Sequence, residues 1–143
     1  MSKREGRCLC GAVSFQLLTE PLTTRVCWCC DCQTMSANGS VNLIVPSSAI
    51  SISGELREFV SIAHSGNEIH RRFCPICGTQ IFANSSARPQ FTGVRVGTLD
   101  DPSSVRPVIN IWTSSAPTWA HIDTSIDSTE KQPDPLPTFI PNI

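Results

Sequence analysis

Eight cysteines in a chain of 143 residues are the side chains most able to carry chemistry. They fall into three short groups, RCLCG, CWCCDC and FCPICGT. In a chain without an export signal, clustered cysteines more often bind metal or do chemistry than form disulfides. The spacing therefore predicts metal sites, and zinc is the metal that such cysteine spacings typically hold.

The first and last groups fit one closed site. Cys74 and Cys77 form a zinc-knuckle half-site, in which both thiolates reach one ion and Gly78 permits the turn that follows. Such a half-site needs two further ligands, and Cys8 and Cys10, also followed by a glycine, are the obvious complement. The four thiolates would join the N-terminus to a distant hairpin. Spacing alone leaves open unligated buried cysteines, or a pairing of the last group with the middle one.

The middle group is different, because Cys27, Cys29 and Cys32 place three thiolates on one predicted loop. Three protein ligands with one exchangeable position are typical of catalytic zinc. Cys30 lies inside this run, and we interpret it as a spare thiol that points away from its neighbours, with the role of an alternative ligand left open. A Cys29–Cys32 disulfide or a redox pair is the alternative interpretation.

The elements that position these groups are predicted to be short strands. Charged residues make up 16% of the chain against about 25% in an average domain, and 11 prolines and 8 glycines interrupt it. Alternating apolar and polar residues indicate half-buried strands. The predicted strands are residues 11–18, 40–45, 58–62, 68–73, 79–83, 91–99 and 108–112. The sequence thus predicts one small, mainly β domain.

Charge and hydropathy exclude other classes. A net charge of −1 and a pI of about 6.3 provide no basic field for a nucleic-acid backbone. No apolar run approaches the ~20 residues of a membrane span. The N-terminal segment has basic residues but no apolar stretch behind them, so we expect no signal peptide and a soluble, cytoplasmic protein.

The order of the motifs resembles the glutathione-dependent formaldehyde-activating enzyme family, which also contains centromere-protein-V-like domains. The resemblance covers roughly residues 4–123 and lies mainly in the order of the three cysteine groups. The matching segments are CLCGAVSF at 8–15, the C-x-C-x-x-C group at 27–32, RFCPICGT at 72–79, GTLDD at 97–101, Pro107 and the P-x-W at 117–119.

Beyond Asp123 the chain is polar and rich in proline, so residues 124–143 are predicted to form an extended tail. The resemblance implies a zinc-bound β-tent fold of short antiparallel strands over residues 4–123. It also implies two zinc ions, one structural and one catalytic. It assigns the structural ion to Cys8, Cys10, Cys74 and Cys77. It assigns the catalytic ion to Cys27, Cys29 and Cys32.

The implied activity is that of a carbon–sulfur lyase, which joins glutathione and formaldehyde to give S-(hydroxymethyl)glutathione. The expected partners are a small thiol such as glutathione and a small aldehyde, with no nucleic acid and no membrane. Family members often carry histidine at two positions where this chain has Trp28 and Asn110, and neither is a zinc ligand of the family. The alternatives are a non-catalytic zinc-binding interaction module and a cysteine redox switch.

Overall fold

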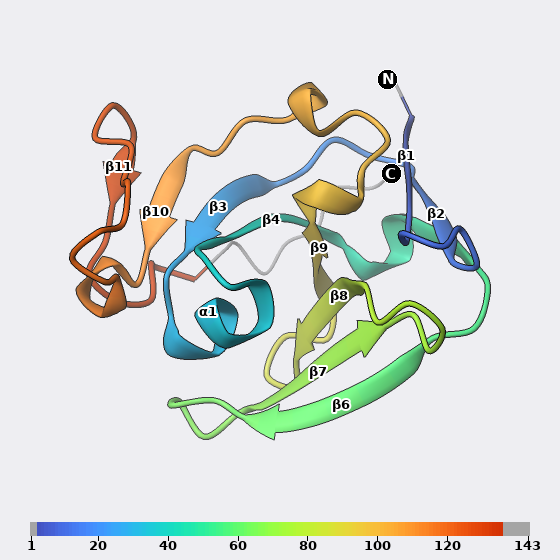
Figure 1. Cartoon of the computed structure of the whole chain (residues 1–143), viewed down its shortest axis with the longest axis horizontal. Coiled ribbons are helices and arrows are strands. Elements are labelled where there is room, and N and C mark those ends of the chain that lie inside the picture. The colour runs from blue at the N-terminus through green and yellow to red at the C-terminus, as the bar shows by residue number, and fades with distance from the viewer. Residues whose placement is uncertain (1–2, 136–143) are drawn as a thin grey trace.

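The computed structural model describes residues 3–135, which form two β-sheets, one short α-helix and four 3-10 helical turns joined by loops (Figure 1). The small sheet has the order β1-β2-β5, and the large sheet has the order β11-β10-β3-β4-β9-β8-β7-β6. The elements are β1 (Arg4–Arg7), β2 (Ser14–Leu17), β3 (Thr23–Cys27), α1 (Cys30–Ser36), β4 (Ser40–Pro46), β5 (Ile50–Ser53), β6 (Arg57–Ile62), β7 (Glu68–Phe73), β8 (Gln80–Ser85), β9 (Phe91–Arg95), β10 (Ile109–Ile111) and β11 (Asp127–Ser128).

The mainly β prediction is confirmed, and most strand pairs are antiparallel. Two pairs are parallel, because β10 lies beside both β3 and β11 with the same direction. The predicted hairpin of residues 58–62 and 68–73 forms as β6 and β7. The predicted strand 91–99 is shorter than expected, because the chain turns into a 3-10 helix at Val96–Thr98.

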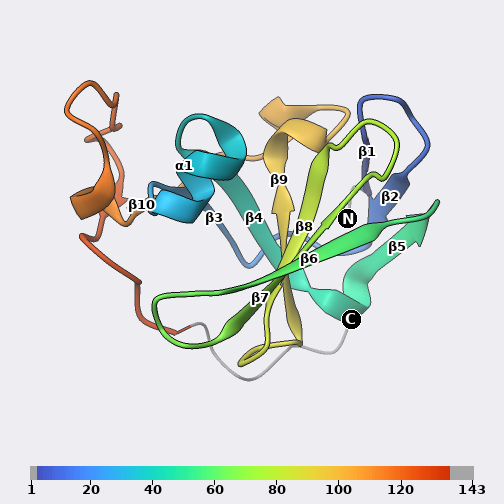
Figure 2. The same cartoon turned by 60° about the horizontal axis from the view of Figure 1, so that its bottom comes forward.

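The hydrophobic core fills the space between the two sheets. Phe15 of β2 meets Phe82 of β8 edge to face, with ring centroids 5.3 Å apart. Leu43, Val45 and Val94 of the large sheet are fully buried in the same cluster. Figure 2 shows β1, β2 and β5 gathered at one side of the large sheet. One face of the large sheet is therefore apolar and packs in the core, and its other face lies outside this core.

The other face of the large sheet carries α1, which contacts β4 (Figure 1). Successive side chains of a strand point to opposite faces of the sheet. A residue that directly precedes or follows a core residue on a strand therefore points to the face that carries α1. Asn42 precedes the core residue Leu43 and therefore lies on the α1 face. The cross-strand register places Cys27 opposite Ser40 on this same face.

The C-terminal segment is only partly described. Residues 136–143 of the predicted tail lie outside the described residues, and the division at residue 123 stays a prediction. Within the described part, β11 pairs with β10, and the backbone N–H of Thr129 donates to the carbonyl of Asn110 at 2.9 Å. No helix within residues 3–135 is long and apolar enough to cross a membrane.

Candidate metal centres

The first and last cysteine groups come together in space, although they lie far apart in the sequence. The sulfur atoms of Cys8, Cys10, Cys74 and Cys77 lie within 4.8 Å of one another. The Sγ–Sγ distances are 3.6 Å for Cys8–Cys10 and 3.7 Å for Cys10–Cys74. A tetrahedral zinc site with Zn–S bonds of about 2.3 Å has sulfur–sulfur edges of about 3.8 Å. The four sulfurs therefore fit one tetrahedral ion, and they are too far apart for a disulfide.

A tight turn positions the first two sulfurs. The backbone N–H of Cys8 donates to the carbonyl of Val13 at 2.9 Å, and the N–H of Val13 donates to Cys8 Sγ at 3.2 Å. Gly11 closes the turn with a φ of +82°, a conformation that favours glycine. The alternating β2 follows directly, so the buried strand fixes the turn and its two thiols.

The second turn repeats this design. The backbone N–H groups of Ile76 and Cys77 donate to Cys74 Sγ at 3.4 and 3.5 Å. Gly78 follows with a φ of +76°. The hydroxyl and backbone of Thr79 hydrogen-bond Cys77 and lower the pKa of its thiol to about 5. Hydrogen bonds to sulfur favour the thiolate, which is the form that binds metal.

The middle cysteines form a second, separate cluster. The sulfurs of Cys27, Cys29 and Cys32 lie within 4.8 Å of one another, and Cys30 is exposed and outside the group. No fourth histidine, cysteine or acidic ligand atom joins them among residues 3–135. All eight cysteines are free thiols, so the structure holds no Cys29–Cys32 disulfide.

A helix, rather than the predicted loop, positions this cluster. Cys27 ends β3, and Cys29 is the N-cap of α1, accepting a hydrogen bond at its Sγ from the backbone N–H of Cys32 at 3.4 Å. A cap and a residue of the first helical turn lie on the same side of the helix start. The helix therefore gathers two sulfurs, and the strand before it brings the third.

The thiols of the cluster influence one another strongly. Hydrogen bonds from Cys27 and Cys29 lower the pKa of Cys32 to about 3, and the Arg95 guanidinium adds to the lowering. Hydrogen bonds with Cys29 and Cys32, together with burial, raise the pKa of Cys27. The cluster thus favours a thiolate at Cys32 at neutral pH, which suits it to a cation.

Two residues that sequence analysis did not single out in these roles hold the site in place. Gln33 Nε2 donates to the carbonyls of Trp28 at 2.7 Å and Ser115 at 2.9 Å, and so fastens α1 to the segment after β10. Arg95 donates to Asn42 Oδ1 at 2.7 Å and to Ser40 Oγ. No local sequence pattern predicts these contacts, because the partners of Gln33 and Arg95 are distant in the chain or on neighbouring strands.

The two positions where family members often carry histidine have structural contacts here. Trp28 is buried, with its ring against Gly39. Asn110 is also buried, and its Nδ2 donates to the carbonyl of Asp123 at 2.9 Å and to Ser128 Oγ at 3.2 Å. Asn110 therefore ties the segment around β11 to its neighbour β10.

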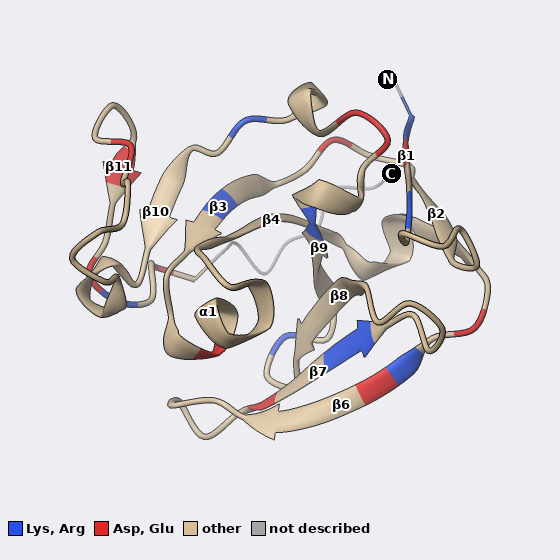
Figure 3. Cartoon of the chain, viewed as in Figure 1, with Lys and Arg blue, Asp and Glu red and all other residues tan. Residues whose placement is uncertain are grey.

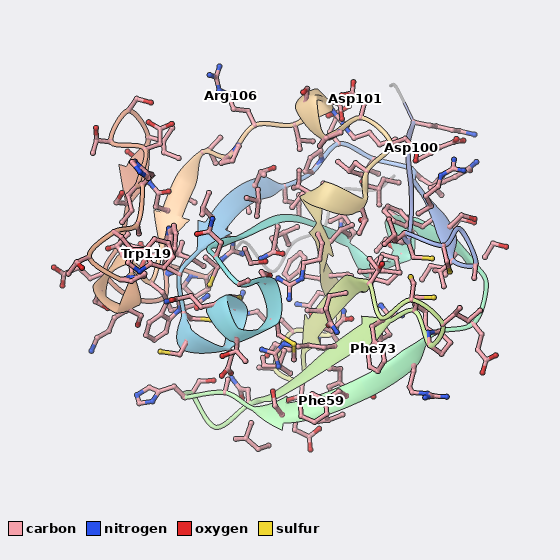
Figure 4. The ribbon with its side chains drawn as sticks, in the orientation of Figure 1. Phe59, Phe73, Asp100, Asp101, Arg106 and Trp119 are labelled. Atoms are coloured by element: carbon pink, nitrogen blue, oxygen red, sulfur yellow. The ribbon has the colours of Figure 1, made fainter. Side chains whose placement is uncertain are left out.

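The other matching segments lie toward the two ends of the molecule. Asp100 and Asp101 lie on the N-terminal side, and Trp119 lies at the opposite end (Figure 4). Asp100 accepts two hydrogen bonds of 3.0 Å from Arg7, and this ion pair lowers the pKa of Asp100. Trp119 is 64% exposed. The residues gathered at the middle cysteines are therefore the better basis for a function.

Comparison with known proteins agrees with this geometry. The family model described as glutathione-dependent formaldehyde-activating enzyme matches residues 3–115. A crystal structure of a protein from Rhodobacter sphaeroides is similar to this chain, with a TM-score of 0.56 and 24% sequence identity. The similarity covers 72% of this chain and 91% of that protein, and it shows a shared fold. None of the curated proteins compared with the chain matches it.

Proposed function

This chain belongs to the glutathione-dependent formaldehyde-activating enzyme family, and on that premise we propose that it adds a thiol such as glutathione to formaldehyde. The product would be S-(hydroxymethyl)glutathione, and the enzyme would be a carbon–sulfur lyase. The observation that carries the proposal is the cluster of Cys27, Cys29 and Cys32, three converging sulfurs with no fourth ligand among the described residues. An open position of this kind accepts a substrate atom.

The proposal includes two zinc ions with different roles. Cys8, Cys10, Cys74 and Cys77 would hold a structural ion, because four sulfurs complete a tetrahedron. The three middle cysteines would hold the second ion. Zinc bound there favours the thiolate form of a fourth sulfur ligand.

The addition of a thiol to formaldehyde requires an activated thiol held beside the small carbonyl compound. A new bond forms between the thiol sulfur and the aldehyde carbon, the carbonyl π bond breaks, and the oxygen takes up the proton that the thiol has lost. The cationic Arg95 beside Cys32 favours negative charge in this region. Gln33 keeps α1, and with it Cys29 and Cys32, fixed relative to Cys27.

This chain has Trp28 where family members often carry histidine, and the difference affects how the proton can be transferred. The indole N–H is a donor only, and its Nε1 is buried without a partner among the described residues. Trp28 therefore supplies packing and cannot exchange a proton. We infer that the proton moves through solvent in this chain.

The test is the rate at which the adduct forms from glutathione and ¹³C-labelled formaldehyde, followed by NMR. We expect the protein to accelerate the reaction above its spontaneous rate, Cys29→Ser to abolish the acceleration and Cys30→Ser to retain it. Cys30 is the matched control, because it is one residue away and outside the sulfur cluster. Acceleration that survives Cys29→Ser would refute the proposed site. Full zinc content without acceleration by the natural chain would favour the non-catalytic zinc module.

We also infer a reducing, cytoplasmic location. The proposed ligands bind metal only as thiolates, and all eight cysteines are free in the structure. A reducing compartment keeps clustered thiols in that state.

A further inference from the structure

Two arginines share the α1 face of the large sheet with the middle cysteines. Arg25 lies two residues before Cys27 on β3, so both side chains point to the same face. Arg25 pairs with Asn42 of β4, and Asn42 pairs with Arg95 of β9. The three residues form one row across three strands. Figure 3 shows basic positions on β3 and β9 around α1.

Neither arginine forms an ion pair with a carboxylate among residues 3–135, although Arg95 lies beside the Cys32 thiol. The ion pairs among residues 3–135 involve other basic residues, namely Arg4, Arg7, His70 and Arg71. The Nε atoms of Arg25 and Arg95 are buried and have no hydrogen-bond partner among the described residues. The hydrogen-bond acceptors of Arg95 on β4 are the neutral groups of Ser40 and Asn42. A buried donor on a cation favours a hydrogen-bond acceptor, so each Nε–H is available to an acceptor that enters this row.

The two side chains remain reachable, because both residues are only half-buried. Neighbouring strands are about 4.8 Å apart, which places the backbones of Arg25 and Arg95 about 10 Å apart with Asn42 between them. That spacing leaves room for a group that both guanidinium forks contact from opposite sides. A carboxylate matches the fork geometry of a guanidinium and supplies negative charge.

The distance to the sulfur cluster suits a thiol that carries a carboxylate. Arg25 and Cys27 are two residues apart on one strand, a separation of about 7 Å. In glutathione, one peptide unit separates the cysteine residue from the C-terminal carboxylate, a reach of about 3.5 Å along the backbone in addition to the side chain. A thiol held at the cysteines would therefore bring its carboxylate to the arginine row.

We propose that Arg25 and Arg95 form a carboxylate-binding subsite, which selects thiols that carry a carboxylate near the sulfur. This inference rests on the proposed function, since it assumes that a thiol binds at the middle cysteines. It assigns the residues that would select glutathione, an anionic peptide thiol, over other small thiols. The rival role for the two arginines is to balance the charge of the protein thiolates, and the experiment separates the two.

The experiment measures binding by isothermal titration calorimetry to the zinc-loaded full chain. The probes are glutathione and its diethyl ester, which keeps the thiol and lacks both carboxylates. We expect the natural chain to bind glutathione about tenfold or more tighter than the ester. Arg25→Gln should remove most of this preference while the affinity for the ester stays within about twofold, and Arg95→Gln should weaken the binding of glutathione by more than the binding of the ester.

Arg57→Gln is the matched control, because Arg57 is exposed on the edge strand β6 and should leave the preference intact. Arg95 also contacts β4, so its substitution can destabilise the fold. The zinc content and melting temperature of each variant are therefore measured. If Arg95→Gln does not fold, the result for Arg25→Gln decides. Equal affinities for the two probes would overturn the subsite and leave the proposed function standing. The subsite would also be overturned if the arginine variants had a lower zinc content, or if they lost affinity for both probes by the same factor. Failure of the natural chain to bind either probe would refute the proposed function itself.

Discussion

Gly39 lies directly against the indole of Trp28. A β-carbon built at Gly39 would be 2.7 Å from the ring atom Cε2 and 2.9 Å from Cζ2, both closer than real contacts allow. Gly39 precedes β4, and Trp28 lies between two of the middle cysteines. The absence of a side chain at residue 39 is therefore what leaves room for the indole. Trp28 fills this space with a buried ring.

We expect Gly39→Ala to destabilise the protein by about 1–3 kcal/mol, because the added methyl group must displace a fully packed ring. Gly97→Ala is the control, since a β-carbon at Gly97 meets nothing within 4 Å and its φ is not in the left-handed region. Urea denaturation of the two variants measures the difference. Equal stability of Gly39→Ala and the natural chain would show that the indole has room to move.

Zinc stoichiometry separates the two metal centres. Elemental analysis of protein purified under reductant should give two equivalents of zinc for the natural chain and for Cys30→Ser, and one for Cys29→Ser. The reason is that Cys29 belongs to the three-sulfur cluster, whereas Cys30 is exposed and outside it. One equivalent in all three proteins would contradict a metal at the middle cysteines.

Loss of the four-sulfur centre should unfold the domain. A structural zinc site contributes about 10–16 kcal/mol of apparent binding free energy, which is comparable with the whole ~5–15 kcal/mol stability of a typical domain. Cys74 is fully buried, and its cluster joins the turn before β2 to the turn before β8. We expect Cys74→Ser, or chelation of the natural chain, to abolish cooperative thermal unfolding measured by circular dichroism. A cooperative transition that persists without metal would contradict a structural ion.

The sequence predicted the strands with alternating residues well, because burial on one face leaves a period of two. The alternating predicted strand 40–45 differs from β4 by one residue, and the strand 68–73, predicted as a hairpin partner, has the bounds of β7. β1 was not predicted, because its sequence REGR has no apolar alternation. Its position depends on pairing with β2 and on Gly6, which lies against Phe15.

The short helix α1 was also missed, for a local reason. Its N-cap is Cys29, which is outside the residue types that usually mark a helix start. The helix has seven residues and buries none of them, so it shows no helical period of apolar residues. The three cysteines of the middle cluster were still recognisable, because their spacing is a local feature. The arginine row was not, since it depends on the order of β3, β4 and β9.

The hairpin of β6 and β7 gives the chain a pH-sensitive contact. His70 lies between two carboxylates, with Nδ1 2.9 Å from Glu58 Oε1 and Nε2 3.1 Å from Glu68 Oε2. The hydrogen bond to Glu58 is the largest cause that raises the pKa of His70 above 6.5, and Glu68 adds to it. A raised pKa in the folded state stabilises the fold fully at pH values below 6.5. The stabilisation is lost as the pH rises through the folded pKa.

We therefore expect the His70 imidazole to titrate above pH 6.5 in NMR spectra of the natural chain, and to titrate at a lower pH in Glu58→Gln. Stability against urea should fall between pH 6 and pH 8 by more in the natural chain than in Glu58→Gln, because the variant loses the larger of the two carboxylate contacts. Glu55→Gln, an exposed position on the loop before β6, should leave the titration unchanged. The effect is small, since the pair lies at the surface and is screened by salt. A titration of His70 that Glu58→Gln does not move would show that the cross-strand hydrogen bond is absent in solution.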